Sequence, residues 1–185
     1  MALTPSNMLP LGTIAPDFEL PDVISGKRLS LFELRGEKGT LIMFICNHCP
    51  YVKHVQSQLV QLANDYPSDE ISFVAISSND VEAYPEDSPE NMREVAKQFR
   101  YLFPYLYDES QDVARKYDAA CTPDFYLFNK DLELVYRGQL DDARPGNEIP
   151  VTGDDIREAL NDLIHGNPIN PDQKPSVGCN IKWKN

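Results

Sequence analysis

Two uninterrupted apolar runs, residues 40–45 (TLIMFI) and 71–76 (ISFVAI), constrain the fold of this chain more than any other feature. Between them, apolar residues recur at alternating spacings of three and four, at positions 52, 55, 59, 62 and 66. Such runs are typical of strands buried on both faces, and this spacing is typical of an amphipathic helix. We therefore expect strand, helix and strand in succession, with Pro67 ending the helix.

The other segments complete an α/β pattern. Residues 18–20 and 28–31 flank a turn and predict a small N-terminal hairpin, and residues 124–128 and 133–137 predict a second hairpin. Ser88 and Pro89 predict the start of a helix, as N-cap and first helical residue. The pattern continues with a short strand at 106–107 and a short helix at 111–117. The last helix begins with a capping-box-like start at 152–155 and stops at Gly166.

This order predicts an α/β class fold, a three-layer α/β/α sandwich around a mixed sheet. With 185 residues, the chain suits one domain. We place that domain at residues 1–166, with an irregular N-terminal arm at 1–16. Residues 167–185 form a proline-bearing C-terminal tail.

Charge and composition narrow the function classes. The formal net charge is −12, from 29 acidic and 17 basic residues. A surface of that sign repels phosphate backbones and anionic lipid, so we expect neither nucleic-acid nor membrane partners. The N-terminus has no basic start followed by a long apolar stretch and does not resemble a secretory signal. We therefore expect a cytoplasmic protein.

The chemistry centres on the motif Cys46-Asn47-His48-Cys49, which lies between the first buried strand and the helix. At that position, free backbone N–H groups and the positive end of the helix dipole favour a thiolate. Since only a thiolate attacks a disulfide, we predict Cys46 as the nucleophile and Cys49, one turn inside the helix, as the resolving thiol. Pro50 excludes the haem-attachment pattern, which needs a histidine there.

His48 lies between the two cysteines and is predicted to tune their pKa values. A protonated imidazole near Cys46 would stabilise the thiolate and so the reduced form, which makes the couple more oxidising. The alternative is that His48 points into water and has little effect.

The strand, C-x-x-C and helix, with Thr122-Pro123 ahead of a later hairpin, resemble the thioredoxin-like superfamily over about residues 10–165. The segments APDFELPD and GKRLSLFELRG resemble its redoxin subgroup (AhpC/TSA, TlpA-like), which includes peroxiredoxins and thiol oxidoreductases. The resemblance implies that Pro123 is cis and that Thr122 presents its backbone to an extended substrate. Without it, an ordinary trans proline would be the expectation.

The sequence in and before the C-x-x-C motif also departs from the usual patterns of the family. Ile45 replaces the usual tryptophan before the first cysteine, and Asn47-His48 replace Gly-Pro; a histidine before the second cysteine resembles the oxidising branch. Peroxiredoxins carry a Thr or Ser where this chain has Met43, and a proline where it has Gly39. The hydroxyl that would hold a peroxide is therefore missing.

Two further cysteines each have more than one possible role. Cys121 precedes the Thr122-Pro123 turn, so it is either a third redox thiol or a small buried apolar residue. Cys179 is in the tail, where it is either an extra resolving thiol, a site of pairing between chains, or a cysteine without a redox role. We treat both as candidate accessory thiols.

We therefore predict a thiol–disulfide oxidoreductase that needs no cofactor and binds no metal. Its partners would be protein or small-molecule thiols and disulfides, together with a cellular reductant. One alternative is a peroxiredoxin-like thiol peroxidase that uses Cys46. The other is a zinc-binding or regulatory module, in which Cys121 or His54 would have to complete the ligand set, because one C-x-x-C supplies two of four ligands.

Overall fold

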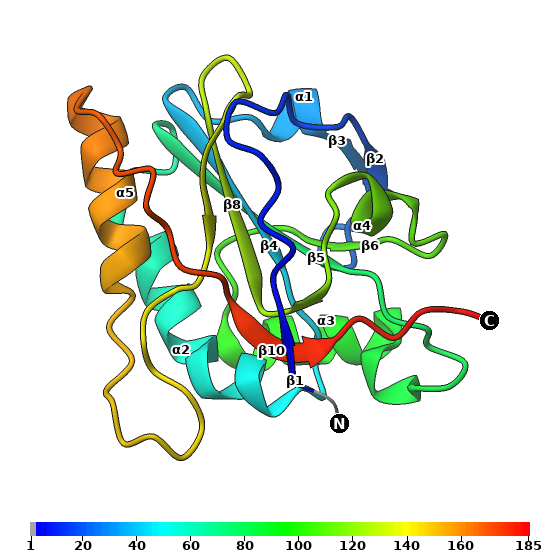
Figure 1. The fold of residues 1–185 in the computed structure, drawn as a ribbon. Coiled ribbons are helices and arrows are strands. Elements are labelled where there is room, and N and C mark those ends of the chain that lie inside the picture. Colours follow the sequence, from blue (N-terminus) through cyan, green and yellow to red (C-terminus); the bar gives the residue numbers. More distant parts are fainter. Residues whose placement is uncertain (1–2) are drawn as a thin grey trace.

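The computed structural model describes residues 3–185 and is built around a mixed five-stranded sheet in the order β6-β5-β4-β8-β9 (Figure 1). Strand β4 pairs in parallel with β5 and antiparallel with β8, which makes the sheet mixed, as the sequence predicts. The strands are β4 (Gly39–Phe44), β5 (Ile71–Ser77), β6 (Tyr105–Tyr107), β8 (Asp124–Asn129) and β9 (Leu134–Gly138).

Each face of the sheet has its own core because side chains alternate along a strand. Leu41 and Met43 of β4 pack against one group of helices, whereas Ile42 and Phe44 pack against the opposite layer. The first layer holds α2 (Pro50–Asp65), α3 (Pro89–Phe99) and α5 (Asp154–His165). The second holds α4 (Asp112–Lys116), α1 (Leu31–Leu34) and the N-terminal hairpin of β2 (Glu19–Pro21) and β3 (Arg28–Ser30). The three-layer sandwich is confirmed.

Local sequence signals mark the starts of α2 and α3 but not that of α5. Pro50 is the first residue of α2, and the Ser88 side chain accepts a hydrogen bond from the N–H of Asn91 at the start of α3. The capping box predicted for α5 is wrong, because its N-cap is Gly153, which makes no side-chain capping bond. Instead, the carboxylate of Asp141 accepts hydrogen bonds from the N–H groups of Thr152 and Gly153.

The arm and the tail meet in a second sheet, in the order β1-β10-β7. Its strands are β1 (Leu3–Pro5), β10 (Val177–Asn180) and β7 (Cys121–Thr122). Figure 1 shows β1 in blue and β10 in red crossing the end of the molecule at which α2 begins. The arm that we expected to be irregular therefore contains a strand, although its residues 1–2 lie outside the described range. The tail places the buried residues Cys179 and Ile181 in the core.

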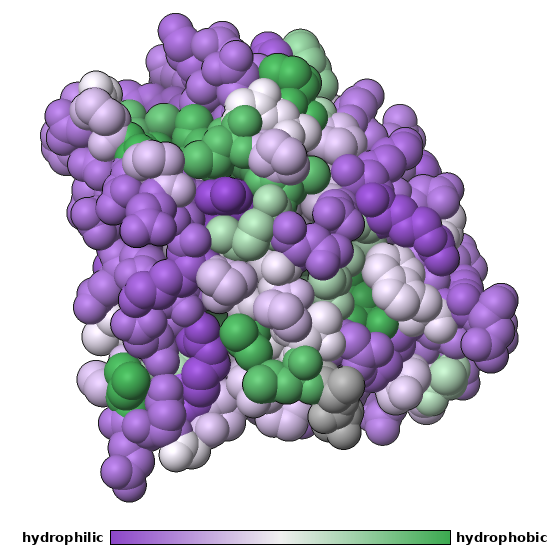
Figure 2. Space-filling model, viewed as in Figure 1, coloured by the Kyte–Doolittle hydropathy of each residue, from purple (hydrophilic) through white to green (hydrophobic). Residues whose placement is uncertain are grey.

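Hydrophilic residues predominate on the face drawn in Figure 2, in keeping with the high content of acidic residues. Among residues 3–185, no helix has the combination of length and apolar character that crossing a bilayer requires.

Candidate functional site

The Cys46 and Cys49 thiols lie at the junction of β4 and α2. Cys46 follows β4 by two residues, and Cys49 is the N-cap of α2. Cys49 therefore stands at the positive end of the helix, not one turn inside it as we expected, and Cys46 stands in the loop before it. Both side chains are buried, with 2% of Cys46 and none of Cys49 exposed.

The pKa values of the two cysteines follow from this placement. They favour a thiolate at Cys49, whereas we expected the thiolate at Cys46. The pKa of Cys49 is lowered to about 5, because the Cys46 thiol donates a hydrogen bond to it and because the N–H groups of Val52 and Cys179 point at the same sulfur. Donating that bond raises the pKa of Cys46, and burial and the charge of Asp87 raise it further. These surroundings favour a thiolate on Cys49 over one on Cys46.

Thr122 faces both sulfurs across a cis peptide bond to Pro123. Its hydroxyl lies 3.5 Å from Cys46 Sγ, and its carbonyl oxygen lies 3.4 Å from Cys49 Sγ. The hydroxyl can donate to a thiolate on Cys46, while the carbonyl can accept from a thiol on Cys49. Thr122 thus stabilises the state in which the shared proton has moved from Cys46 to Cys49.

A buried carboxylate organises the residues between the cysteines. Asp87, at the end of the 3₁₀ helix η1 (Pro85–Asp87), has no exposed surface. One of its oxygens accepts hydrogen bonds from the N–H groups of Asn47 at 2.7 Å and His48 at 3.2 Å. The other lies 2.5 Å from His48 Nδ1 and accepts from Asn79 Nδ2 at 2.8 Å. Burial would raise the pKa of Asp87, but these bonds hold it below its usual value.

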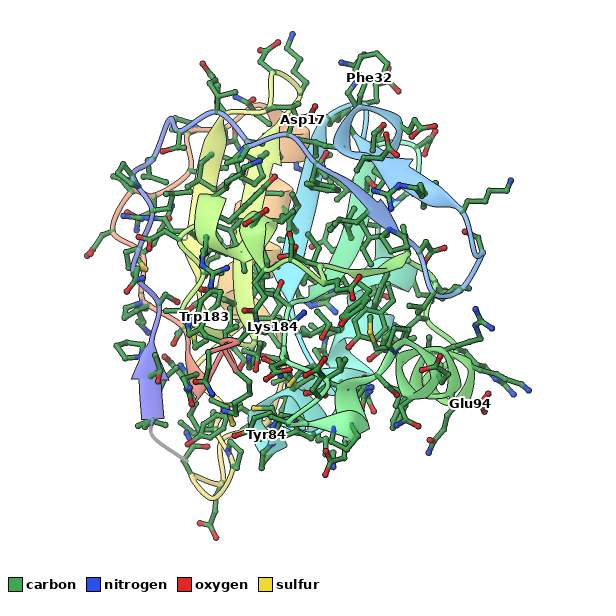
Figure 3. The ribbon with its side chains drawn as sticks, turned by 90° about the vertical axis from the view of Figure 1, so that its right-hand side faces the viewer. Asp17, Phe32, Tyr84, Glu94, Trp183 and Lys184 are labelled. Carbon is green, nitrogen blue, oxygen red and sulfur yellow. The ribbon has the colours of Figure 1, made fainter. Side chains whose placement is uncertain are left out.

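His48 therefore does not point into water, and one of its ring nitrogens lies within 4.8 Å of Cys46 Sγ. Its hydrogen bond to Asp87 raises its pKa, and its ring stacks on Tyr84 with the ring centres 5.2 Å apart. Figure 3 shows Tyr84 in the same half of the view as the C-terminal Trp183 and Lys184. The charge of Asp87 raises the pKa of Cys46 and so opposes a thiolate there. Direct tuning of Cys46 by His48 therefore stays a prediction.

Asp87 is the functional residue that the sequence reasoning missed. It lies within an acidic stretch with Glu82, Glu86 and Glu90, a pattern that is typical of a solvated loop. Nothing in the local sequence separates it from its neighbours, because its partners are 39 and 40 residues earlier in the chain.

The same residues provide a test of the zinc alternative. One ligand atom each from Cys46, His48 and Asp87 lies within 4.8 Å of the others. However, a metal held by a nitrogen and an oxygen at about 2.0–2.2 Å needs more room between them than the 2.5 Å found for His48 and Asp87. His54 is exposed on α2, and the Cys121 thiol faces the carbonyl oxygen of Pro123 at 3.8 Å. The two residues that we expected to complete a zinc site therefore face elsewhere.

The two accessory cysteines differ in their surroundings. Cys121 is fully buried, and burial raises its pKa well above the usual value, which favours its interpretation as a core residue. Cys179 is also buried, but its sulfur lies 2.7 Å from Cys49 Sγ. Burial, followed by the hydrogen bond to Cys49, raises the pKa of Cys179 to about 12. Of the two, Cys179 is the one in contact with the reactive pair.

The buried carboxyl group of Asp124, next to Pro123, should make the stability of the protein depend on pH. Burial raises its pKa to about 7, although Ser6 and Tyr126 donate hydrogen bonds to it. The native state then holds a proton that the unfolded chain, with a pKa of about 3.9, releases, so stability falls as the pH rises between these values. Asp124→Asn should abolish this fall, which we put at roughly 3–4 kcal/mol.

Urea unfolding of the wild type and Asp124→Asn at several pH values between 4 and 8 measures this effect. The exposed Asp131→Asn is the matched control and should follow the wild type. Parallel curves for Asp124→Asn and the wild type would show that Asp124 is ionised throughout.

Comparisons with known proteins place this arrangement in a family. The model of the AhpC/TSA family matches residues 11–137. An uncharacterised conserved protein from Geobacillus kaustophilus is 62% identical, with a TM-score of 0.98 over 100% of this chain and 97% of its own. A hypothetical protein from Sinorhizobium meliloti 1021 is 46% identical, with a TM-score of 0.95 over 98% of both chains.

A more distant structure shares the fold. The C-terminal domain of a putative thiol-disulfide oxidoreductase from Bacteroides thetaiotaomicron is 19% identical, with a TM-score of 0.66 over 85% of this chain and 97% of its own. A search of curated proteins returned no match. The family model covers more than half of the sequence, and the chain therefore belongs to the AhpC/TSA family, on a thioredoxin-like fold.

Proposed function

We propose that this protein is a thiol–disulfide oxidoreductase in which Cys46 attacks and Cys49 resolves. The observation that supports this most strongly is the placement of both thiols at the start of α2, with the Thr122 hydroxyl 3.5 Å from Cys46 Sγ and the Thr122 carbonyl oxygen 3.4 Å from Cys49 Sγ. Membership of a redox family that uses cysteine chemistry supports the same assignment.

Cys46 takes the role of attacking thiol because of its position. Cys49 is enclosed by Cys46 on one side and by Cys179 on another, whereas Cys46 lies in the loop outside the helix. For the attack, the proton of Cys46 passes to Cys49, the neighbouring thiol with the lower pKa. The Cys46 thiolate then forms a bond to one sulfur of the substrate disulfide, and the other sulfur leaves as a thiolate.

The second step regenerates a free substrate. The Cys49 thiol loses its proton and attacks Cys46 Sγ in the mixed disulfide, and the second substrate sulfur leaves and takes up a proton. The substrate has then gained two electrons, and the protein holds a Cys46–Cys49 disulfide. A thiol or dithiol reductant returns the protein to its starting state, in the cytoplasmic setting that we propose from the sequence.

The reduction of insulin disulfides by dithiothreitol tests this function, because reduced insulin precipitates and scatters light. Wild-type protein should accelerate precipitation, and Cys49→Ser should accumulate as a covalent complex with the substrate that runs as a larger species without reductant. Cys121→Ala, which removes a buried thiol outside the pair, should behave as wild type. An uncatalysed rate with wild-type protein would contradict the proposal.

Thiol peroxidase activity is the second candidate, favoured by the AhpC/TSA family match. Against it, Met43 replaces the hydroxyl residue that would hold a peroxide, and its side chain is fully buried in the core. Stopped-flow measurement of hydrogen peroxide consumption separates the two functions. We expect a rate no greater than that of a free thiol; a rate far above it would favour the peroxidase.

A further inference from the structure

The strand β10 occupies the main-chain edge of Thr122, beside the reactive pair. Cys179 pairs with Thr122, and Asn180 pairs with Cys121, in antiparallel register. An extended substrate adds to an exposed strand edge by the same main-chain hydrogen bonds. The edge that the family resemblance assigns to the substrate is therefore filled by a segment of the chain itself, with a cysteine opposite Thr122.

This strand is held firmly on both sides of Cys179. Before it, Val177 and Gly178 pair with the N-terminal strand β1. After it, the N–H of Ile181 donates to Ala120 O at 3.0 Å, and the N–H of Lys182 donates to Asn79 Oδ1 at 2.9 Å. Asn79 also donates to Asp87, so the segment after Cys179 is tied to the carboxylate that organises the loop 46–49.

The Cys179 sulfur lies within bonding reach of Cys49. The distance of 2.7 Å between the two sulfurs exceeds that of a disulfide, about 2.05 Å, by less than an ångström. Both thiols are buried, with 3% of Cys179 exposed. Cys49 thus has two neighbouring thiols, Cys46 and Cys179, each placed to form a bond with it.

We propose that Cys179 is a third redox thiol, a built-in substrate that exchanges with the Cys46–Cys49 disulfide to give a Cys49–Cys179 disulfide. This inference builds on the proposed function. In the exchange, Cys179 loses its proton and its sulfur bonds to Cys49 Sγ. The bond between Cys46 and Cys49 breaks, and its electron pair stays on Cys46, which takes up a proton. The oxidation state of the protein does not change.

The electrostatics of the site favour this exchange once the first disulfide has formed. The charge on Cys49 and the hydrogen bond to it contribute to the raised pKa of Cys179. A Cys46–Cys49 disulfide removes that charge, while the Lys182 ammonium remains and favours the Cys179 thiolate. The product ties β10 covalently to the start of α2 and leaves Cys46 as a free thiol.

Mapping of disulfides in the oxidised full-length chain tests the proposal. Reduced protein is oxidised with glutathione disulfide and quenched with acid. Its free thiols are alkylated, and its disulfide-linked peptides are identified by mass spectrometry without reduction. Wild type should fall from four free thiols to two and yield a Cys49–Cys179 peptide. Cys46→Ser should still yield that peptide, Cys179→Ser should yield only Cys46–Cys49, and Cys121→Ala should match wild type.

The outcomes separate this inference from the proposed function. In one result, the wild type yields only the Cys46–Cys49 peptide, as Cys179→Ser does, and no Cys49–Cys179 peptide. That result would overturn the inference and leave the proposed function standing. In the opposite result, the wild type yields the Cys49–Cys179 peptide, and the Cys46–Cys49 peptide is found neither in the wild type nor in Cys179→Ser. That result would support Cys179 as a redox thiol and contradict the proposed function. Because the wild type alone decides the first point, failure of a variant to fold does not affect it.

Gly178→Ala provides a second test that keeps all four thiols. A Cβ at this position would overlap the backbone carbonyl of Thr122, which cannot easily move, so β10 must shift away from β7. We expect a several-fold lower yield of the Cys49–Cys179 peptide and faster alkylation of Cys46 and Cys49. Lys130→Ala, at an exposed position far from β10 in the chain, is the control. An unchanged yield of the peptide in Gly178→Ala would show that the placement by β10 is not what brings Cys179 to Cys49.

Discussion

Replacement of Cys46 by serine should lower the rate of insulin reduction by at least about a hundredfold, to the rate without protein. A serine hydroxyl fills the same space next to Thr122 but supplies no thiolate, so the mixed disulfide with the substrate cannot form. Cys49 keeps its thiol in this variant but stays enclosed by residue 46 and Cys179. The light-scattering assay with equal amounts of folded wild type and variant measures the difference.

The comparison of two single variants makes this prediction specific. Cys46→Ser should neither turn over nor become linked to insulin, whereas Cys49→Ser should become linked but release product slowly. Cys121→Ala serves as the control for loss of a buried thiol. If instead Cys46→Ser became linked to the substrate and Cys49→Ser did not, Cys49 would be the attacking thiol, and the low pKa found for it would explain why.

Asp87→Asn should lower the free energy of unfolding by roughly 2–4 kcal/mol. The carboxylate accepts from two backbone N–H groups, from His48 and from Asn79. An amide has only one oxygen, so its NH₂ group must face donors on one side. The variant therefore leaves buried donors unpaired, including backbone N–H groups of the loop that carries the cysteines. The exposed neighbour Glu86→Gln is the control and should unfold like the wild type.

The difference between the wild type and Asp87→Asn should depend on pH. The pKa of His48 is raised by Asp87, so its contribution is complete below about 6.5 and is lost as the pH rises through the folded-state value. The pKa of Asp87 is lowered, so its contribution is complete above about 3.9 and is lost as the pH falls through its folded-state value. The difference should therefore be greatest between about pH 4 and 6.5. A constant difference across the range would show that the pair does not ionise as described.

Local patterns in the sequence were sufficient to predict most of the fold. Periodicity identified the buried strands and α2, and Ser88 with Pro89 located the start of α3, because these signals depend on residues within one element. The start of α5 was misread, because its N–H groups are satisfied by Asp141, which lies more than ten residues earlier. A capping box is a local pattern and carries no information about such a partner.

The candidate site was predictable only in part, for the same physical reason. The C-x-x-C motif and Thr122-Pro123 could be identified from short motifs and a family resemblance. The pKa order of the cysteines could not, because it depends on the N-cap position of Cys49 and on the buried charge of Asp87. Cys179 lies 130 residues from Cys49, and only the pairing of β10 with β7 brings the two together.

The redox behaviour of the pair Cys46 and Cys49 tests the central claim most directly. In the Cys179→Ser variant, equilibration in dithiothreitol buffers of graded potential, followed by acid quenching and differential alkylation, reports each thiol separately. We predict that Cys46 and Cys49 become protected from alkylation together, with a single midpoint for a two-electron couple, while Cys121 remains a thiol. If Cys46 and Cys49 both remained free thiols at the most oxidising potential, the account would be contradicted.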